Sequence, residues 1–192
     1  MIIGVVGQIA SGKSILSDIL VQHGFDKLAF SSEIREELRL RGLPLERKIL
    51  QDIGNEMRER EGNEYWAKRV IAKINYGKNY VIEGMRNPAE IEALQRLDNF
   101  ILIAVDAPIE RRFQWIMMRG KDGDPHTLEG IKLIDARDMG IGEESHGQKT
   151  AECIKRSDHI IINDGTKEQL TKKIEKLLKK LKINGDLTSD KL

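Results

Sequence analysis

Near its start the chain reads Gly7-Gln8-Ile9-Ala10-Ser11-Gly12-Lys13-Ser14. The apolar run Ile2–Val6 comes directly before this stretch and predicts a strand, and the apolar spacing that begins at Ile15 predicts a helix. A strand, a glycine loop and a helix start form the context in which the pattern G-x-x-x-x-G-K-[ST] indicates a phosphate-binding loop. The alternative interpretation is a chance match in a glycine turn before a helix.

In such a loop the backbone N–H groups point into one concavity, and the helix N-terminus adds partial positive charge. We therefore expect the loop to bind ATP, with Lys13 reaching the β and γ phosphates and the Ser14 hydroxyl as a ligand of Mg²⁺. The loop residues expected to contact the nucleotide are Gly7, Ala10, Ser11, Gly12, Lys13 and Ser14.

Length and composition predict a single domain without a strong charge bias. The chain has 192 residues, 32 Lys and Arg against 31 Asp and Glu, and a net charge of +1, which favours neither nucleic acid nor an anionic membrane as a partner. The single cysteine, Cys153, excludes an internal disulfide framework and is expected to be half-buried on a helix. The run Phe100–Val105 is too short to span a membrane, so we expect a soluble cytoplasmic protein.

Strand-like apolar runs alternate with helical stretches along the chain. This alternation is typical of a parallel sheet covered by helices on both faces. A helix is expected to begin at Asn87-Pro88, and a last helix to run from Thr166 to about Leu181. We predict one domain over residues 1–183, followed by a tail over 184–192. The predicted strands are Ile2–Val6, Lys27–Phe30, Tyr80–Glu83, Phe100–Val105 and His159–Asn163.

Two insertions interrupt the alternation, and both leave the carboxyl ends of predicted strands, where open α/β sheets bind ligands. The first covers residues 31–75 and includes the predicted helices Glu33–Arg41 and Pro44–Arg60. The second covers residues 111–137 and includes a glycine loop at 120–125. We interpret each insertion as a candidate flap over the phosphate loop.

A carboxylate at the end of a buried strand is costly unless it is paired or hydrated. Glu83 ends such a strand and is followed by Gly84 and Arg86, so we expect Glu83 to organise Mg²⁺, directly or through water, and Arg86 to act in catalysis. The alternative is a surface salt bridge between Glu83 and Arg86. Asp106 is a rival carboxylate at the end of another strand, which we interpret as a structural helix cap.

Guanidinium groups suit phosphate oxygens, and several arginines occur near the predicted ligand edge. Arg112 and Arg119 are two helical turns apart, with Arg111 beside them, and Arg137 follows on the next helix. We expect Arg119 and Arg137 to contact the transferred phosphoryl group; the alternative is that they are solvated helix charges. The helix start at Ser31-Ser32 supplies capping serines, and the expected acceptor-binding residues are Ser32, Arg35 and Arg86, with Arg58 as a further candidate.

The chain resembles the small nucleotide kinases of the adenylate kinase and dephospho-coenzyme A kinase group, most of all a mainly archaeal branch of that group. The resemblance rests on Gly7–Ser14, Ser32-Glu33-Ile34-Arg35, Val81–Arg86, Arg112–Arg119, Ala136-Arg137-Asp138 and Ser157–Gly165. It implies a three-layer P-loop NTPase fold with a five-stranded parallel sheet. In that fold, residues 31–75 would be a helical acceptor-binding insertion and residues 111–137 a lid. It also implies that Gly165, in the turn after the last predicted strand, borders the adenine; a plain turn is the alternative.

The residues together predict an ATP- and Mg²⁺-dependent kinase that acts on a small phosphate acceptor. The acceptor stays open among nucleoside monophosphates, deoxynucleotides and the dephospho-coenzyme A class, because Phe30-Ser31-Ser32 replaces the Thr-Gly-Asp usual in adenylate kinases. The alternative is a nucleotide-binding regulatory or adaptor protein with weak or no transferase activity. The sequence contains neither the Asn-Lys-x-Asp nor the Asp-x-x-Gly motif of switch GTPases.

Overall fold

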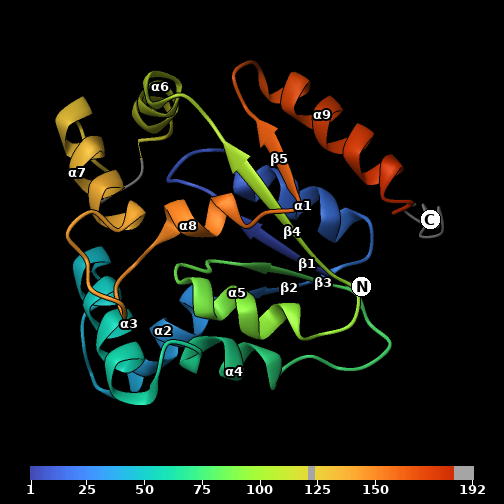
Figure 1. The fold of residues 1–192 in the computed structure, drawn as a ribbon. Coiled ribbons are helices and arrows are strands. Elements are labelled where there is room, and N and C mark those ends of the chain that lie inside the picture. Colours follow the sequence, from blue (N-terminus) through green and yellow to red (C-terminus); the bar gives the residue numbers. More distant parts are fainter. Residues whose placement is uncertain (121–123, 184–192) are drawn as a thin grey trace.

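A computed structural model describes residues 1–120 and 124–183. Five strands form one sheet in the order β2-β3-β1-β4-β5, and every neighbouring pair is parallel. Helices cover both faces of this sheet (Figure 1), which confirms the predicted α/β class. The strands are β1 (Ile2–Val6), β2 (Asp26–Ala29), β3 (Tyr80–Glu83), β4 (Phe100–Asp106) and β5 (His159–Ile162).

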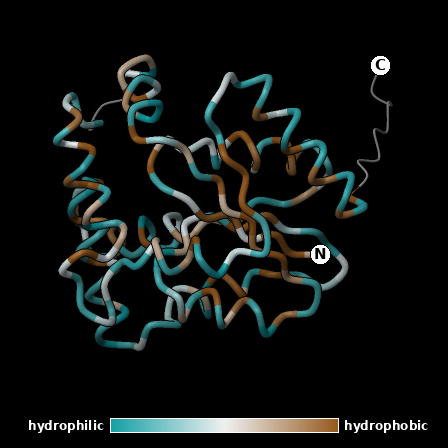
Figure 2. Tube along the Cα trace, turned by 45° about the horizontal axis from the view of Figure 1, so that its top comes forward, coloured by the Kyte–Doolittle hydropathy of each residue, from teal (hydrophilic) through white to brown (hydrophobic). Residues whose placement is uncertain are grey.

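Alternation along the strands divides the core between the two faces of the sheet, because successive side chains of a strand point to opposite sides. Odd-numbered residues such as Ile3 and Val81 pack against α1 (Lys13–Gln22) and α9 (Lys167–Lys180). Figure 2 shows the hydrophobic segments gathered along the central strands, with mostly hydrophilic colours on the outer helices. The sheet is therefore the middle of three layers.

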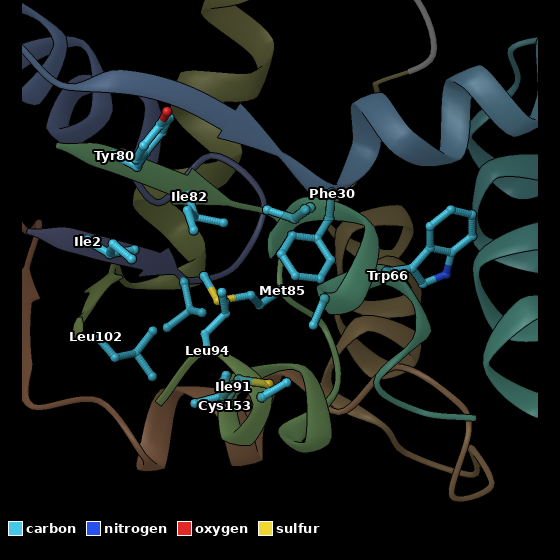
Figure 3. Packing of buried hydrophobic residues seen from close by; sticks show 14 of the residues in the cluster. Ile2, Phe30, Trp66, Tyr80, Ile82, Met85, Ile91, Leu94, Leu102 and Cys153 are labelled. Atoms are coloured by element: carbon cyan, nitrogen blue, oxygen red, sulfur yellow. The ribbon is translucent and has the colours of Figure 1, made fainter. Parts of the chain in front are cut away.

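Even-numbered strand residues face the larger core, shown in Figure 3. Trp66 is fully buried here, and its Nε1 donates a hydrogen bond to the Gly54 carbonyl at 3.0 Å, which fastens one helix of the first insertion to another. The helices on this side are α2 (Phe30–Leu40), α3 (Arg47–Glu61), α4 (Tyr65–Ile71), α5 (Pro88–Gln95) and α8 (Thr150–Lys155).

A third, small apolar cluster joins the phosphate loop to the second insertion. Ile9 of the loop packs with Ile116 of α6 (Ile109–Arg119) and Ile131 of α7 (Leu128–Met139). The two helices of the predicted lid therefore rest on the loop itself. Residues 121–123 of the predicted lid loop lie outside the described part of the chain.

Several predicted helix boundaries were wrong, among them the start of α2. Ser31 and Ser32 do not cap α2, because Ala29 is the N-cap residue in an extended conformation and the helix begins at Phe30. The second helix of that insertion begins at Arg47, three residues beyond Pro44. Helices α4 and α8 were not predicted, because with 7 and 6 residues they are too short for a clear periodicity.

Two predicted helix starts are confirmed, and a capping box explains each of them. Asn87 caps α5 through a reciprocal capping box with Pro88 in the first turn, and Thr166 caps α9 in the same way. The predicted tail at residues 184–192 lies outside the described residues. Within residues 1–120 and 124–183, no helix has both the length and the apolar character needed to cross a lipid bilayer.

Candidate functional site

Strand register brings three predicted site segments to one edge of the sheet. Val5, which leads into the phosphate loop, pairs with Glu83 at the end of β3. Ala29, which leads into α2, pairs with Glu83 from the other side. The loop, the strand-end carboxylate and the start of the first insertion are therefore neighbours at the carboxyl end of the sheet, where ligands bind in open α/β folds.

The loop has a backbone that requires small residues. Gly7, Ala10 and Gly12 have positive φ angles of 149°, 57° and 106°. A Cβ atom at Gly7 would lie 2.1 Å from the Val105 carbonyl oxygen, so no larger residue fits between the loop and β4. This glycine-dependent turn directly before α1 is typical of a phosphate-binding loop, in which backbone N–H groups bind the anion.

Lys13 closes this loop in the structure. Its Nζ donates a hydrogen bond to the Gln8 carbonyl at 2.5 Å. The loss of hydration, together with the positive charge of Arg86, lowers the pKa of Lys13 to about 7, although the charges of Glu83 and Asp138 oppose this shift. A phosphate group next to this ammonium would restore the charged form, so the residue is suited to an anionic ligand.

The rest of the loop fits a polyphosphate and Mg²⁺. The Asn163 side chain donates a hydrogen bond to the Ser11 carbonyl at 2.9 Å and holds the loop against the end of β5. The Ser11 hydroxyl is buried and has no hydrogen-bond partner among the described residues. Ser14 is exposed in the first turn of α1, which leaves its hydroxyl accessible to a cation.

A cavity of about 300 Å³ opens beside Lys13, between the sheet edge and the first insertion. This volume lies at the lower end of the range for small-molecule sites. Four arginines line the cavity, and they come from three different segments of the chain. They are Arg35 on α2, Arg47 and Arg58 on α3, and Arg86 after β3.

Glu83 lines the same cavity and does not pair with Arg86, so the alternative of a Glu83–Arg86 salt bridge was wrong. Its Oε2 lies 3.2 Å from the Lys27 Nζ on β2. Its Oε1 is buried and has no hydrogen-bond partner among residues 1–120 and 124–183. One carboxylate oxygen is thus fixed by Lys27, and the other stays available at the wall of the cavity.

Asp138 organises two of the cavity arginines, although we had not singled it out as a site residue. It is fully buried and accepts hydrogen bonds from Arg86 at 3.1 Å, Arg47 at 3.3 Å and the Gln51 side chain at 2.9 Å. Arg47 is also new to the site, and removal from water lowers its pKa. No sequence periodicity marks these residues, because the cluster forms only when α3 and α7 meet.

The remaining acceptor candidates divide between the cavity and the core. Arg35 donates a hydrogen bond to the Ser31 hydroxyl at 2.9 Å, and both residues line the cavity. Ser32 is exposed and is not among the lining residues. Arg58 lies in the cavity wall, but its buried guanidinium is bound to Glu90 at 2.7 Å. Arg58 is therefore mainly structural.

Arg112 does not share an exposed face with Arg119 for phosphate binding, which corrects the sequence interpretation. It is buried and forms two hydrogen bonds to Asp135, at 3.0 and 2.6 Å. It also donates to the carbonyls of Ala107 and Ile9. This guanidinium fastens α6 and α7, the two helices of the predicted lid, to the phosphate loop.

The other lid arginines are paired at the surface. Arg119 forms two hydrogen bonds to Asp124, at 2.6 and 2.7 Å. Arg137 points to α3 instead, where it binds Asp52 at 2.7 Å, and it lies 3.3 Å from Glu143. Arg137 is not among the cavity-lining residues, so a role in catalysis would require the lid to move.

Two further predicted positions have structural contacts. Asp106 does not cap α6, whose N-cap residue is Pro108; its carboxylate accepts a hydrogen bond from the adjacent Ala107 N–H. Gly165 lies against the capping box of α9, where an added Cβ would lie 1.9 Å from the Gln169 Oε1. A larger residue there would displace the Gln169 side chain from this capping box, and the place of Gly165 beside the adenine stays a prediction.

Comparison with known proteins places the chain in a family. No protein-family model matches it. A UPF0200 protein from Sulfurisphaera tokodaii is 33% identical over 182 residues, which are 94% of this chain and 97% of that protein. The chain belongs to the UPF0200 family. A UPF0200/UPF0201 protein from Archaeoglobus fulgidus is 34% identical over 97% of this UPF0200 chain, which spans 57% of the length of that relative.

Solved structures similar to this UPF0200 chain have the fold of P-loop kinases. TT1252 from Thermus thermophilus has a TM-score of 0.58 with 22% identity, over 94% of this chain and 97% of its own. Shikimate kinase from Acinetobacter baumannii, in complex with shikimate, has a TM-score of 0.57 with 16% identity, over 95% of each chain. At these identities the likeness shows a kinase-like fold. The narrower resemblance to adenylate and dephospho-coenzyme A kinases stays a prediction.

Proposed function

We propose that this UPF0200 protein is an ATP-dependent kinase that transfers the γ-phosphoryl group to a nucleotide or nucleotide-like small molecule. One observation carries the proposal: Lys13 of the phosphate loop lines the same cavity as Arg35 and Arg47. A phosphoryl donor in the loop and an anionic acceptor in the cavity would thus be neighbours. Phosphoryl transfer depends mainly on such positioning and on charge stabilisation.

Each residue has a role that its surroundings support. Gly7, Ala10, Ser11 and Gly12 would bind the phosphates through the loop backbone, and Lys13 would neutralise the transferred group. Ser14 would hold Mg²⁺, which screens the charge of the phosphates when bound. The free Glu83 oxygen is suited to orient a magnesium-bound water, because its partner oxygen is already fixed by Lys27.

The cationic side chains would act on the two substrates in different places. Arg35, Arg47 and Arg86 would bind the anionic group of the acceptor inside the cavity. Arg119 would exchange Asp124 for phosphate oxygens as the lid closes, and closure would exclude water and so prevent ATP hydrolysis. The balanced net charge of +1 favours a small-molecule partner over nucleic acid or a membrane.

A coupled assay of ADP release tests the proposal. The protein is mixed with ATP, Mg²⁺ and, one at a time, nucleoside monophosphates, deoxynucleotides and dephospho-coenzyme A. We expect ADP release that depends on one acceptor class and falls about 100- to 1,000-fold in Lys13→Met, as for loss of one charge-stabilising donor. The exposed Lys172→Met on α9 is the matched control. ATP binding without acceptor-dependent ADP release would favour the regulatory alternative.

A further inference from the structure

Gln148 is a cavity residue with an unused polar group. It lies in the segment between α7 and α8, and it lines the cavity that contains Arg86 and Arg47. The residue is 5% exposed, and its Oε1 is buried without a hydrogen-bond partner among the described residues. Buried polar atoms in folded proteins are almost always paired, so an unpaired one needs a specific explanation.

The backbone on both sides of Gln148 is fixed. The Lys149 N–H donates a hydrogen bond to the Arg86 carbonyl at 2.6 Å. The Asn87 side chain donates to the carbonyls of Gly147 at 3.1 Å and Ser145 at 2.9 Å. Because the chain is fastened immediately before and after it, the backbone of Gln148 is held at the wall of the cavity that Arg86 also lines.

Two other residues of the cavity also have a buried polar atom without a hydrogen-bond partner among the described residues. The Arg47 Nε and the Glu83 Oε1 are also buried and unpaired within the part of the chain that the structure describes. Both of these residues line the same cavity. Three unpaired polar groups of different kinds, a donor and two acceptors, therefore converge on one space of small-molecule size. This convergence indicates a ligand with matching groups.

The cavity side chains other than Glu83, which is assigned to the magnesium-bound water, divide the acceptor into two parts. Arg47 and Arg35 present guanidinium donors, which suit the oxygens of a phosphate group. The Gln148 Oε1 only accepts hydrogen bonds, so it would repel a phosphate oxygen and requires a hydroxyl or N–H group. Such a group belongs to the uncharged body of a phosphomonoester.

We propose that Gln148 determines acceptor specificity: its Oε1 accepts a hydrogen bond from a hydroxyl or N–H group of a phosphomonoester whose phosphate binds Arg35 and Arg47. The proposal rests on the proposed function, because it assigns the cavity to the phosphate acceptor. A site with a buried acceptor atom rejects analogues that lack the donor, since the protein atom is then left unpaired.

Calorimetric titration of Gln148→Met tests this role, because methionine has a similar length and no hydrogen-bonding amide. AMP, GMP, CMP, UMP and inorganic phosphate are titrated separately, with ADP and Mg²⁺ present to occupy the loop. We expect the Kd of the preferred monophosphate to rise about tenfold and the Kd of inorganic phosphate to stay unchanged. The midpoint of thermal unfolding should stay equal or rise, because an unpaired buried group is removed. Gln95→Met, exposed on α5, should change none of these values.

Each outcome decides the proposal. If Gln148→Met binds every monophosphate with the Kd of the wild type, the proposal is overturned, even if the wild type transfers phosphoryl groups. A wild type that binds no monophosphate would also overturn it. Gln148-dependent binding without any transfer would support it while the proposed kinase function fails. A lower unfolding midpoint with equal losses for monophosphates and inorganic phosphate would make Gln148 structural. If Gln148→Met does not fold, Gln148→Asn, which retracts the amide, should weaken monophosphate binding alone.

Discussion

Asp138 on α7 accepts a hydrogen bond from Arg86 at 3.1 Å, although 52 residues separate the two in the chain. The same carboxylate binds Arg47 and Gln51 of α3. One buried negative charge therefore balances two cavity arginines and ties α7 to α3. The position of α7 and the charge of the cavity are linked through this residue.

Replacement of Asp138 tests this link. Asp138→Asn should lower the free energy of unfolding by about 2 kcal/mol, because an amide cannot balance the buried arginine charge. Urea unfolding followed by circular dichroism measures the change. Asp98→Asn, an exposed position after α5, should leave stability unchanged. Equal stability of Asp138→Asn and wild type would show that the carboxylate does not hold the arginines together.

The lowered pKa of Lys13 predicts how stability depends on pH. Its pKa is about 7 in the folded protein, against 10.5 for an ordinary lysine. Between these values the unfolded chain holds the extra proton, so the free energy of unfolding should rise with pH across this window. The rise occurs because the folded protein releases an unfavourably placed charge that the unfolded chain keeps.

Lys13→Met removes this contribution. Urea unfolding of the variant and the wild type at pH values from about 6 to 10 isolates it, because all other groups are shared. The stability of the wild type relative to the variant should increase with pH above about 7. A difference that is independent of pH would contradict a perturbed Lys13.

Arg119 tests the role of the lid. Arg119→Ala should lower kcat more than it raises the KM of the acceptor, because the guanidinium is expected to bind the phosphoryl group in the transition state. Steady-state kinetics with the acceptor found in the coupled assay measures both constants. Lys132→Ala, exposed on the other lid helix, is the charge-matched control. A change in KM alone would move Arg119 to the acceptor pocket.

Cys153 should be chemically inert. Burial raises the pKa of its thiol to about 12, and the charge of Glu90 adds to the shift. Because thiolates are the reactive form, a thiol reagent at about pH 8 should not modify the folded protein. The guanidinium-unfolded chain should react at its single cysteine. Rapid modification of the folded protein would show that α8 opens readily.

The fold was largely predictable because its signals are local. Mostly apolar runs of four to six residues predicted the strands, and Asn87 and Thr166 marked two helix starts. The exact junction of β2 and α2 was missed, because Ala29 caps the helix without any side-chain signal. The half-buried position predicted for Cys153 was also wrong, because this residue of α8 is fully buried in the larger core.

The candidate site was predictable only where residues follow a strand end. Gly7–Ser14, Glu83 and Arg86 belong to such segments, and the parallel register places them together. Arg47 and Gln148 enter the cavity from α3 and from the segment before α8, so only tertiary packing reveals them. Conversely, Arg112 and Arg119 do lie two turns apart on one helix, as predicted, but Arg112 is buried because it binds Asp135.

The position of β1 in the middle of the sheet has a consequence for synthesis. Its neighbours are β3 and β4, so it gains both partners only after Asp106 has left the ribosome. The phosphate loop is thus among the first segments to be translated but must wait for more than half of the chain before it takes its shape. Such late pairing of distant strands slows folding and leaves apolar surface exposed on the nascent chain, where chaperones bind.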